Sequence, residues 1–205
     1  MLRRLFQCVA LALSLLAPAQ IAEAQFPPWF APRQDQDVGD QPGYVPDPSE
    51  DEPPPQFRRQ LVYYRSSEAP GTIIVHTSER FLYVVQPNGR ALRYGIGVGR
   101  DGFQWQGLLK ISRKQEWPDW TPPQEMIERQ PYLPRFMAGG PGNPLGARAL
   151  YLGNTVYRIH GTNQPQTIGS AVSSGCFRLV NNDVIDLYDR VPLGTKVIVR
   201  QRPEL

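Results

Sequence analysis

The sequence predicts a mainly β domain with one short helix, preceded by an export signal and a disordered proline-rich segment. Three observations support this architecture. Short apolar segments alternate with Gly, Pro and Asn-Gly turns over the last two thirds of the chain, which is typical of many short strands. Only residues 183–190 carry apolar side chains at a convincing helical spacing. Near the N-terminus, many prolines and acidic residues occur with few aliphatic ones, a composition that cannot form a core.

The first 24 residues have the three parts of a secretory signal peptide. Two arginines at positions 3 and 4 precede an apolar run at 9–17, and Ala22–Ala24 has the small-x-small pattern of a cleavage site. The apolar run is shorter than the ~20 residues that cross a bilayer, so a retained anchor is the weaker alternative. We expect cleavage after Ala24, export to the periplasm or cell wall, and no stable membrane insertion afterwards.

Cleavage would leave Cys176 as the single cysteine of the mature protein, because the other one, Cys8, lies in the signal. One cysteine forms no internal disulfide, so the thiol of an exported protein is buried, paired between chains, or reactive. A buried and inert thiol is the ordinary case. The residues around Cys176 favour a reactive one.

Residues 25–62 are expected to form a disordered, partly extended spacer. Residues 25–60 carry three Arg against seven Asp and Glu, whereas residues 61–205 carry seventeen basic against eleven acidic residues. An acidic tail therefore precedes a basic domain, which suits anionic polymers or peptides that bear carboxylates. Nucleic acid is not an expected partner, since neither a recognition helix nor an aromatic and basic surface is visible.

Residues 63–205 have the length of one domain and contain seven predicted strands. In the first hairpin the turn Asn88-Gly89 joins two apolar segments, because both residues accept a positive φ. The predicted strands span residues 72–76, 81–85, 91–98, 108–112, 149–152, 156–160 and 196–200.

The helix is expected at 183–190, with Asn181 or Asn182 as its cap and an apolar stripe at helical spacing. Between Trp105 and Leu150 the strand pattern is broken by Pro- and Gly-rich segments at 117–123 and 138–144. A long irregular stretch inside a domain is typical of a lid or binding loop.

Two motifs that carry chemistry lie close together in the sequence. His160-Gly161 ends a predicted strand, and Cys176 follows sixteen residues after the histidine, in Ser173-Ser174-Gly175-Cys176. The thiolate is the nucleophilic form, and a thiol of pKa ~8.5 is mostly protonated near neutrality. A neighbouring imidazole takes that proton and later exchanges it with the amine partner. The Ser-Ser-Gly before the cysteine offers backbone N–H groups at a tight turn, which are suited to holding an oxyanion.

The sequence gives little support for other kinds of functional site. The second histidine, His76, has no nucleophile near it in sequence and is interpreted as structural. A metal site is not expected, because the mature chain has two His and one Cys without clustered carboxylates. The glycines at 138–144 lack the Gly-Lys-Ser/Thr ending of a phosphate loop. We therefore expect neither a metal nor a cofactor.

This arrangement closely resembles the L,D-transpeptidase catalytic domain, also called the YkuD or ErfK family. The family motif is His-Gly, a short spacer, and Ser/Thr-x-Gly-Cys-apolar-Arg. The match covers about residues 70–200 and includes Ile-Ser-Arg-Lys at 111–114, Trp-Thr-Pro-Pro at 120–123 and the segment at 141–148. Two positions depart from the common pattern: Ser174 stands where many members have a second histidine, and Phe177 replaces the usual aliphatic residue.

The resemblance implies a β-sandwich or barrel and a two-step reaction on peptidoglycan. Cys176 would attack the L-centred carbonyl of the third residue of a tetrapeptide stem, release D-alanine and form a thioester. Carbapenems would mimic the donor and acylate Cys176. His160 would be the base, oriented by the Gly161 carbonyl. Ser174, Gly175 and Cys176 would supply the backbone N–H donors for the oxyanion. Arg178 would stabilise the site or meet a substrate carboxylate; an ion pair in the region of Asp183 or Asp186 is an equal alternative.

The acceptor of the acyl group stays open. The amine of a neighbouring stem would give a 3-3 cross-link, the amine of an envelope protein would anchor that protein to the wall, and water would make a carboxypeptidase or amidase.

Sortases place the histidine far upstream of the cysteine, and papain-like peptidases place the cysteine first. A non-catalytic wall-binding module would need neither His160 nor the turn around Cys176.

Overall fold

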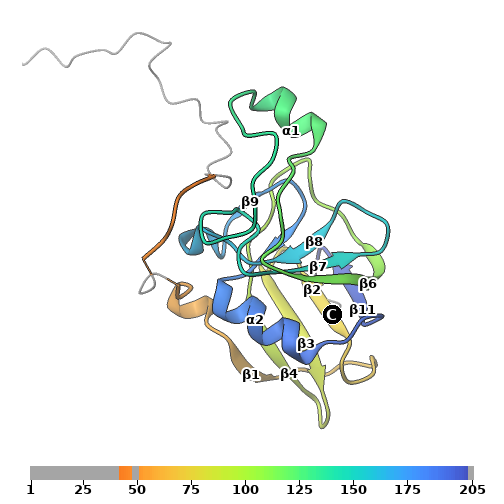
Figure 1. The fold of residues 1–205 in the computed structure, drawn as a ribbon. Coiled ribbons are helices and arrows are strands. Elements are labelled where there is room, and N and C mark those ends of the chain that lie inside the picture. Colours follow the sequence, from red (N-terminus) through yellow and green to blue (C-terminus); the bar gives the residue numbers. More distant parts are fainter. Residues whose placement is uncertain (1–41, 48–50, 203–205) are drawn as a thin grey trace, which may run out of the picture. The chain divides into compact units, whose positions relative to one another are not determined.

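The computed structural model describes residues 42–47 and 51–202 (Figure 1). The expected signal peptide and residues 25–41 and 48–50 of the expected spacer lie outside the described residues. Eleven strands are defined in the described part: β1 Gln60–Tyr63, β2 Ile73–His76, β3 Phe81–Gln86, β4 Arg90–Gly95, β5 Val98–Gly99, β6 Gly107–Glu116, β7 Arg148–Leu152, β8 Arg158–His160, β9 Ala171–Ser173, β10 Phe177–Arg178 and β11 Lys196–Arg200.

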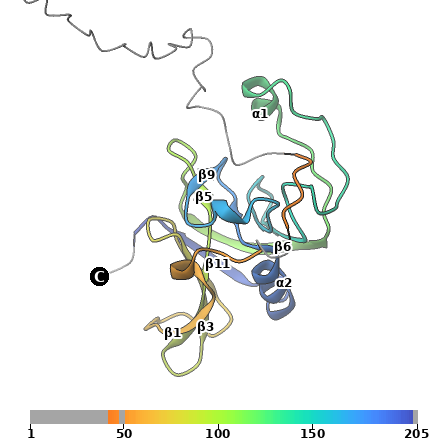
Figure 2. The ribbon, with the colours of Figure 1, turned by 90° about the vertical axis from the view of Figure 1, so that its left-hand side faces the viewer.

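Nine of these strands form one mixed sheet in the order β1-β4-β3-β2-β11-β6-β7-β8-β10. The remaining two, β5 and β9, pair in a second, two-stranded sheet and lie side by side in Figure 2. The prediction of a mainly β domain is confirmed. All seven predicted strands are present, and the hairpin β3–β4 turns at Asn88 and Gly89, whose φ values are 62° and 67°. The β4 prediction ran three residues too far, because the chain leaves the sheet after Gly95 and reaches β5.

The main core lies between one face of the sheet and the second α-helix, α2 (Asn181–Arg190), which crosses that face in Figure 1. Val184 and Leu187 of α2 are fully buried with Ile73 and Val75 of β2 and Val197 of β11. Burial of a Val or Leu side chain contributes about 1.5–3 kcal/mol each. This packing fixes α2, and with it the segment that follows the cysteine motif.

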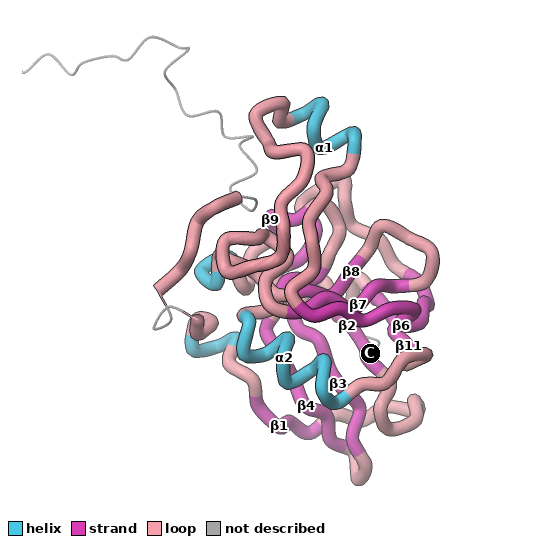
Figure 3. The backbone as a smooth tube through the Cα atoms, in the orientation of Figure 1, coloured by secondary structure: helices cyan, strands magenta, loops and turns pink. Residues whose placement is uncertain are grey.

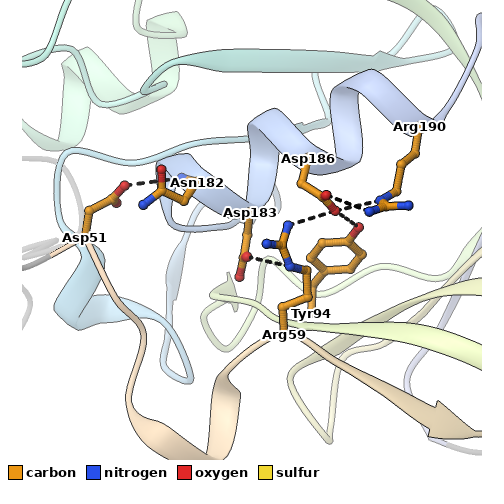
Figure 4. Close-up of polar contacts among 7 residues, drawn as sticks. All are labelled: Asp51, Arg59, Tyr94, Asn182, Asp183, Asp186 and Arg190. Atoms are coloured by element: carbon orange, nitrogen blue, oxygen red, sulfur yellow. Dashed lines mark hydrogen bonds and ion pairs between the residues drawn. The ribbon is translucent and has the colours of Figure 1, made fainter.

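The start of α2 differs from the prediction. The helix begins at Asn181, two residues earlier than expected, and neither Asn181 nor Asn182 caps it, since the residue at the N-cap position is Val180. The Asn181 side chain instead accepts a bond from Ala147 N and donates one to Thr162 O. The free N–H groups of the first turn are bound by the Asp51 carboxylate (Figure 4).

Residues 51–62 also differ from the expected spacer, because they pack on the domain. They contain the 3-10 helix η3 (Pro55–Phe57) and the beginning of β1, which pairs with β4. Arg59 forms ion pairs with Asp183 and Asp186 of α2 (Figure 4). Composition was misleading here: a few specific contacts order a segment that is poor in aliphatic residues.

Both α-helices are short. The helix α1 (Gln124–Arg129) was not predicted; it lies in the long irregular stretch between β6 and β7 (Figure 3). Its Met126 and Ile127 form a small separate core with Trp120, Leu133 and Leu145. No helix in the part of the chain that the structure describes has the length and apolar character needed to cross a membrane.

Candidate active site

Strand pairing brings the two motifs of the sequence together. β10 runs parallel to β8, with Phe177 opposite Ile159 and Arg178 opposite His160. Cys176, directly before β10, is therefore at the level of Arg158, the first residue of β8, two positions from the level of His160. Cys176 and His160 line the same cavity of about 50 Å³. The other lining residues come from α1 and its flanking loops between β6 and β7, from β8 and the residues before it, and from the turn with its flanking strands β9 and β10: Trp120, Pro123, Met126, Pro144, Leu145, Val156, Arg158, Ser173, Ser174 and Arg178.

His160 is buried and held by its own backbone neighbour. Its Nδ1 lies 2.6 Å from the Gly161 carbonyl oxygen, and only 4% of the residue is exposed. Burial lowers the pKa of His160 to about 3; the charges of Arg178 and Arg158 act in the same direction, and hydrogen bonds with the Gly161 and Leu145 backbone oppose them. The imidazole is therefore neutral near pH 7, the form that accepts a proton.

Cys176 is partly exposed at the cavity and ends a tightly bonded turn. Its Sγ lies 3.8 Å from the Val156 carbonyl oxygen. The Ser173 hydroxyl donates to the Cys176 carbonyl oxygen at 2.6 Å and accepts the Gly175 N–H at 3.2 Å. The Gly175 N–H, one of the three expected oxyanion donors, is thus engaged inside the turn.

Gly175 is required in this turn for two reasons. Its φ is +106°, which side chains rarely adopt. An added Cβ would also lie 2.7 Å from Cε1 of Tyr157 and 3.1 Å from the carbonyl oxygen of Phe103. Any larger residue would displace the turn that carries Cys176.

Arg178 lines the cavity but is buried, with 3% of its surface exposed. Its backbone pairs in both directions with Gly97, which ties β10 to the segment before β5. The ion pairs of Asp183 and Asp186 are formed with Arg59 and Arg190. An ion pair of Arg178 with the region of Asp183 or Asp186 stays one of the two predicted roles of this arginine.

Three residues near the cavity were missed by the sequence reasoning. Arg158 lines the cavity two residues before His160, and the two-residue period of a strand was a signal for it. Arg129 of α1 reaches the Ser174 hydroxyl at 3.3 Å. Trp105 reaches the Gly175 carbonyl at 2.8 Å. The sequence held no signal for the last two, since both contacts join segments at least 45 residues apart.

His76 is not among the residues that line this cavity. It is buried in β2, and its Nε2 lies 2.8 Å from the hydroxyl of Tyr64. Its ring also contacts Tyr83 edge-on. These contacts agree with the structural interpretation of this histidine.

Comparison with known proteins gives consistent matches. A family model of the L,D-transpeptidase catalytic domain (YkuD) matches residues 70–199. The chain is 40% identical over 140 residues to the probable L,D-transpeptidase ErfK/SrfK of Escherichia coli K12, which covers 64% of this chain and 44% of that protein. The chain spans about half the length of the curated relatives it matches.

Solved structures resemble it as well. L,D-transpeptidase 3 from Mycobacterium tuberculosis aligns over 64% of this chain and 62% of its own, with a TM-score of 0.51 and 15% identity, which shows the shared fold. A Brucella melitensis structure, described as a probable carnitine operon oxidoreductase, is 53% identical over 72% of this chain and 96% of its own, with a TM-score of 0.49. The domain match extends over more than half of the sequence, so this chain belongs to the L,D-transpeptidase catalytic domain family.

Proposed function

We propose that this chain is a peptidoglycan L,D-transpeptidase of the periplasm, with Cys176 as nucleophile and His160 as base. The observation that carries the proposal is that both side chains line one cavity while His160 Nδ1 is held by the Gly161 carbonyl. With Nδ1 bound in this way, Nε2 is the nitrogen that we assign as the proton acceptor.

The first half-reaction makes a thioester. As His160 Nε2 takes the thiol proton, Sγ attacks the carbonyl carbon of the third stem residue, and the C–N bond to D-alanine breaks. The proton returns from the imidazolium to the departing amine. Because burial, Arg178 and Arg158 disfavour the imidazolium, we propose that proton transfer accompanies the attack and that no stable imidazolium precedes it.

The second half-reaction transfers the acyl group. An acceptor amine attacks the thioester carbonyl, gives its proton to His160, and the thiolate of Cys176 leaves. We propose the side-chain amine of a neighbouring stem as the acceptor, which makes a 3-3 cross-link. An envelope-protein amine or water in the same step would give protein anchoring or hydrolysis, and product analysis distinguishes the three.

The charge at the cavity supports a carboxylate-bearing donor. Arg158 lines the cavity, is only partly buried, and stacks over Tyr151 with its Cζ 5.3 Å from the ring centroid. Its buried Nε has no hydrogen-bond partner among the described residues. Arg178 is almost fully covered, so we assign Arg158 as the cation that meets a stem carboxylate and Arg178 as a support of the turn.

The test is an incubation of residues 25–205 with disaccharide-tetrapeptides, followed by mass spectrometry. A dimer that has lost one D-alanine is expected, and a free tripeptide would show water as the acceptor. Cys176→Ala should abolish both products while the fold is kept, since it removes only the thiol. Unchanged cross-linking by Cys176→Ala would refute the mechanism.

A carbapenem provides an independent test of the base. The family resemblance implies that it acylates Cys176 and leaves a slowly resolved adduct, which intact-protein mass spectrometry detects. His160→Gln should slow this acylation by roughly 10²–10⁴, the usual contribution of a positioned acid–base group. Equal acylation rates of the two proteins across neutral pH would show that His160 is not the base.

A further inference from the structure

Trp105 makes a directed hydrogen bond to the residue before the nucleophile. It lies in the segment between β5 and β6, and its indole Nε1–H donates to the Gly175 carbonyl oxygen at 2.8 Å. The indole stacks on Tyr157, with centroids 4.4 Å apart and an interplanar angle of 12°. It also contacts Phe177, at 5.5 Å between centroids. The packing of the indole on Tyr157 and Phe177 therefore fixes the donor.

We infer that Trp105 is a positioning residue that aims the Cys176 backbone N–H at the oxyanion formed during acyl transfer; this inference rests on the function proposed above. The Gly175 carbonyl and the Cys176 N–H belong to one peptide unit. In a trans peptide the two groups lie in one plane and point in opposite directions. A donor that fixes the carbonyl on one side therefore fixes the N–H on the other.

The hydrogen bonds of Ser173 do not fix the orientation of the peptide unit between Gly175 and Cys176. The Ser173 hydroxyl accepts the Gly175 N–H, which belongs to the peptide unit before this one. It donates to the Cys176 carbonyl, which belongs to the peptide unit after it. Neither contact controls the peptide between those residues. Gly175 has a φ of +106°, where a glycine turn allows the next peptide to rotate at little steric cost. The bond from Trp105 opposes that rotation.

The same bond strengthens the donor. A carbonyl that accepts a hydrogen bond polarises its own peptide, so that the N–H of the same unit becomes a better donor, by roughly 10–30% per bond. Trp105 Nε1–H, the Gly175 carbonyl, the Cys176 N–H and the oxyanion would then form one cooperative chain. The effect appears only when negative charge develops on the substrate oxygen, so it acts on the acylation rate and not on substrate affinity.

The experiment compares two reactions of the same thiol. Acylation by meropenem forms an oxyanion at the lactam carbonyl, whereas alkylation by iodoacetamide displaces iodide and forms none. In Trp105→Phe, which keeps an aromatic ring but lacks the N–H, we expect the maximal acylation rate to fall roughly tenfold, less than the 10²–10³ lost with a whole oxyanion donor. Alkylation and the half-saturating meropenem concentration should each stay within about twofold.

Two further proteins make the comparison specific. Trp117→Phe removes an exposed indole outside the cavity lining and should leave both rates unchanged. Replacement of Trp105 by β-(3-benzothienyl)alanine keeps the size of the indole and exchanges only N–H for sulfur, so it should reproduce the acylation defect even if Trp105→Phe folds poorly.

Three results would contradict the inference. Equal losses of acylation and alkylation would mean that Trp105 only supports the thiol or the fold. Unchanged acylation in the benzothienyl variant would mean that the N–H contributes nothing. If the unaltered protein itself is not acylated, the proposed function fails, and the inference fails with it.

Discussion

The carboxylate of Asp51 accepts the backbone N–H of Asn181 at 3.0 Å, across 130 positions of sequence. Its second oxygen accepts the N–H of Asn182 at 3.2 Å. Asp51 thereby performs the function of an N-cap residue, which Val180 at the cap position lacks the side chain to perform. A negative charge is also favourable at this end of the helix dipole. The segment before β1 thus stabilises the helix that follows the cysteine motif.

Asp51→Ala should lower the free energy of unfolding by about 1 kcal/mol, because the first turn of α2 loses its acceptors. Urea denaturation followed by circular dichroism measures the change. Glu52→Ala is the matched control: its ion pair with Arg58 is exposed on both sides, so the expected loss is below about 0.5 kcal/mol. Equal effects of the two substitutions would show that the cap contributes nothing beyond surface charge.

Arg59 neutralises a carboxylate that is nearly buried, since the Asp183 side chain is 7% exposed. Burial raises the pKa of Asp183 to about 6, with Arg59 opposing the shift. Arg59→Gln should therefore cost about 2 kcal/mol at pH 8, between the values for surface and buried pairs. The cost should shrink at pH 5, because Asp183 is then largely protonated and has little charge for Arg59 to stabilise.

Arg190→Gln is the control for this pH dependence. Burial raises the pKa of Asp186, but hydrogen bonds from Arg190 and Tyr94 and the charge of Arg59 together lower it to about 2. Asp186 is thus ionised at both pH 5 and pH 8, and the cost of Arg190→Gln should be the same at the two pH values. A cost of Arg59→Gln that is equally independent of pH would refute the assignment to Asp183.

The N-terminal boundary of the folded unit can be tested by truncation. A protein that starts at residue 51 keeps the cap and the ion pairs of Arg59, whereas one that starts at residue 61 lacks both. We expect the shorter protein to be less stable by about 3 kcal/mol or more, since it leaves Asp183 buried and unpaired. Equal unfolding midpoints in urea would place the boundary at 62, as composition suggested.

The strands were predictable because their signals are local. Alternating or continuous apolar runs such as 72–76 and 196–200 predict buried strands from their own residues alone. Asn88-Gly89 in the same way predicts the turn that it forms. The pairing of β10 with β8 was implied only indirectly, by the Gly-containing turn between two motifs.

The missed features all depend on tertiary contacts. η3 and β1 are ordered by contacts with α2 and β4, and no composition rule includes such partners. Asn181 looked like a cap because of its residue type, yet its side chain binds Ala147 and Thr162 instead. Trp105 belongs to the site only because the chain returns to Gly175 seventy residues later.

The neutral, buried His160 predicts a loss of stability in acid. Its pKa in the folded protein is about 3, below the ~6.5 of an exposed histidine, so the unfolded chain binds the proton first as the pH falls. The contribution of His160 to the free energy of unfolding is fully present above about pH 6.5. It is lost as the pH falls towards 3, by up to about 1.4 kcal/mol per pH unit. Denaturation of parent and His160→Gln at pH 7, 6 and 5 should show the parent losing more stability. Parallel curves would contradict the burial of a neutral imidazole.

The final prediction concerns the donor carboxylate that we assign to Arg158. Arg158→Gln should lower kcat/KM for a tetrapeptide donor with free carboxylates roughly tenfold or more, as expected for a lost charge-assisted hydrogen bond. For a donor whose carboxylates are amidated, the same substitution should change little, because no charge remains to be paired. Arg113→Gln is the matched control: Arg113 stacks on the same Tyr151 ring, with Cζ 3.6 Å from its centroid, but does not line the cavity. If Arg158→Gln slows both donors equally, the arginine supports the structure of the site and does not recognise the stem.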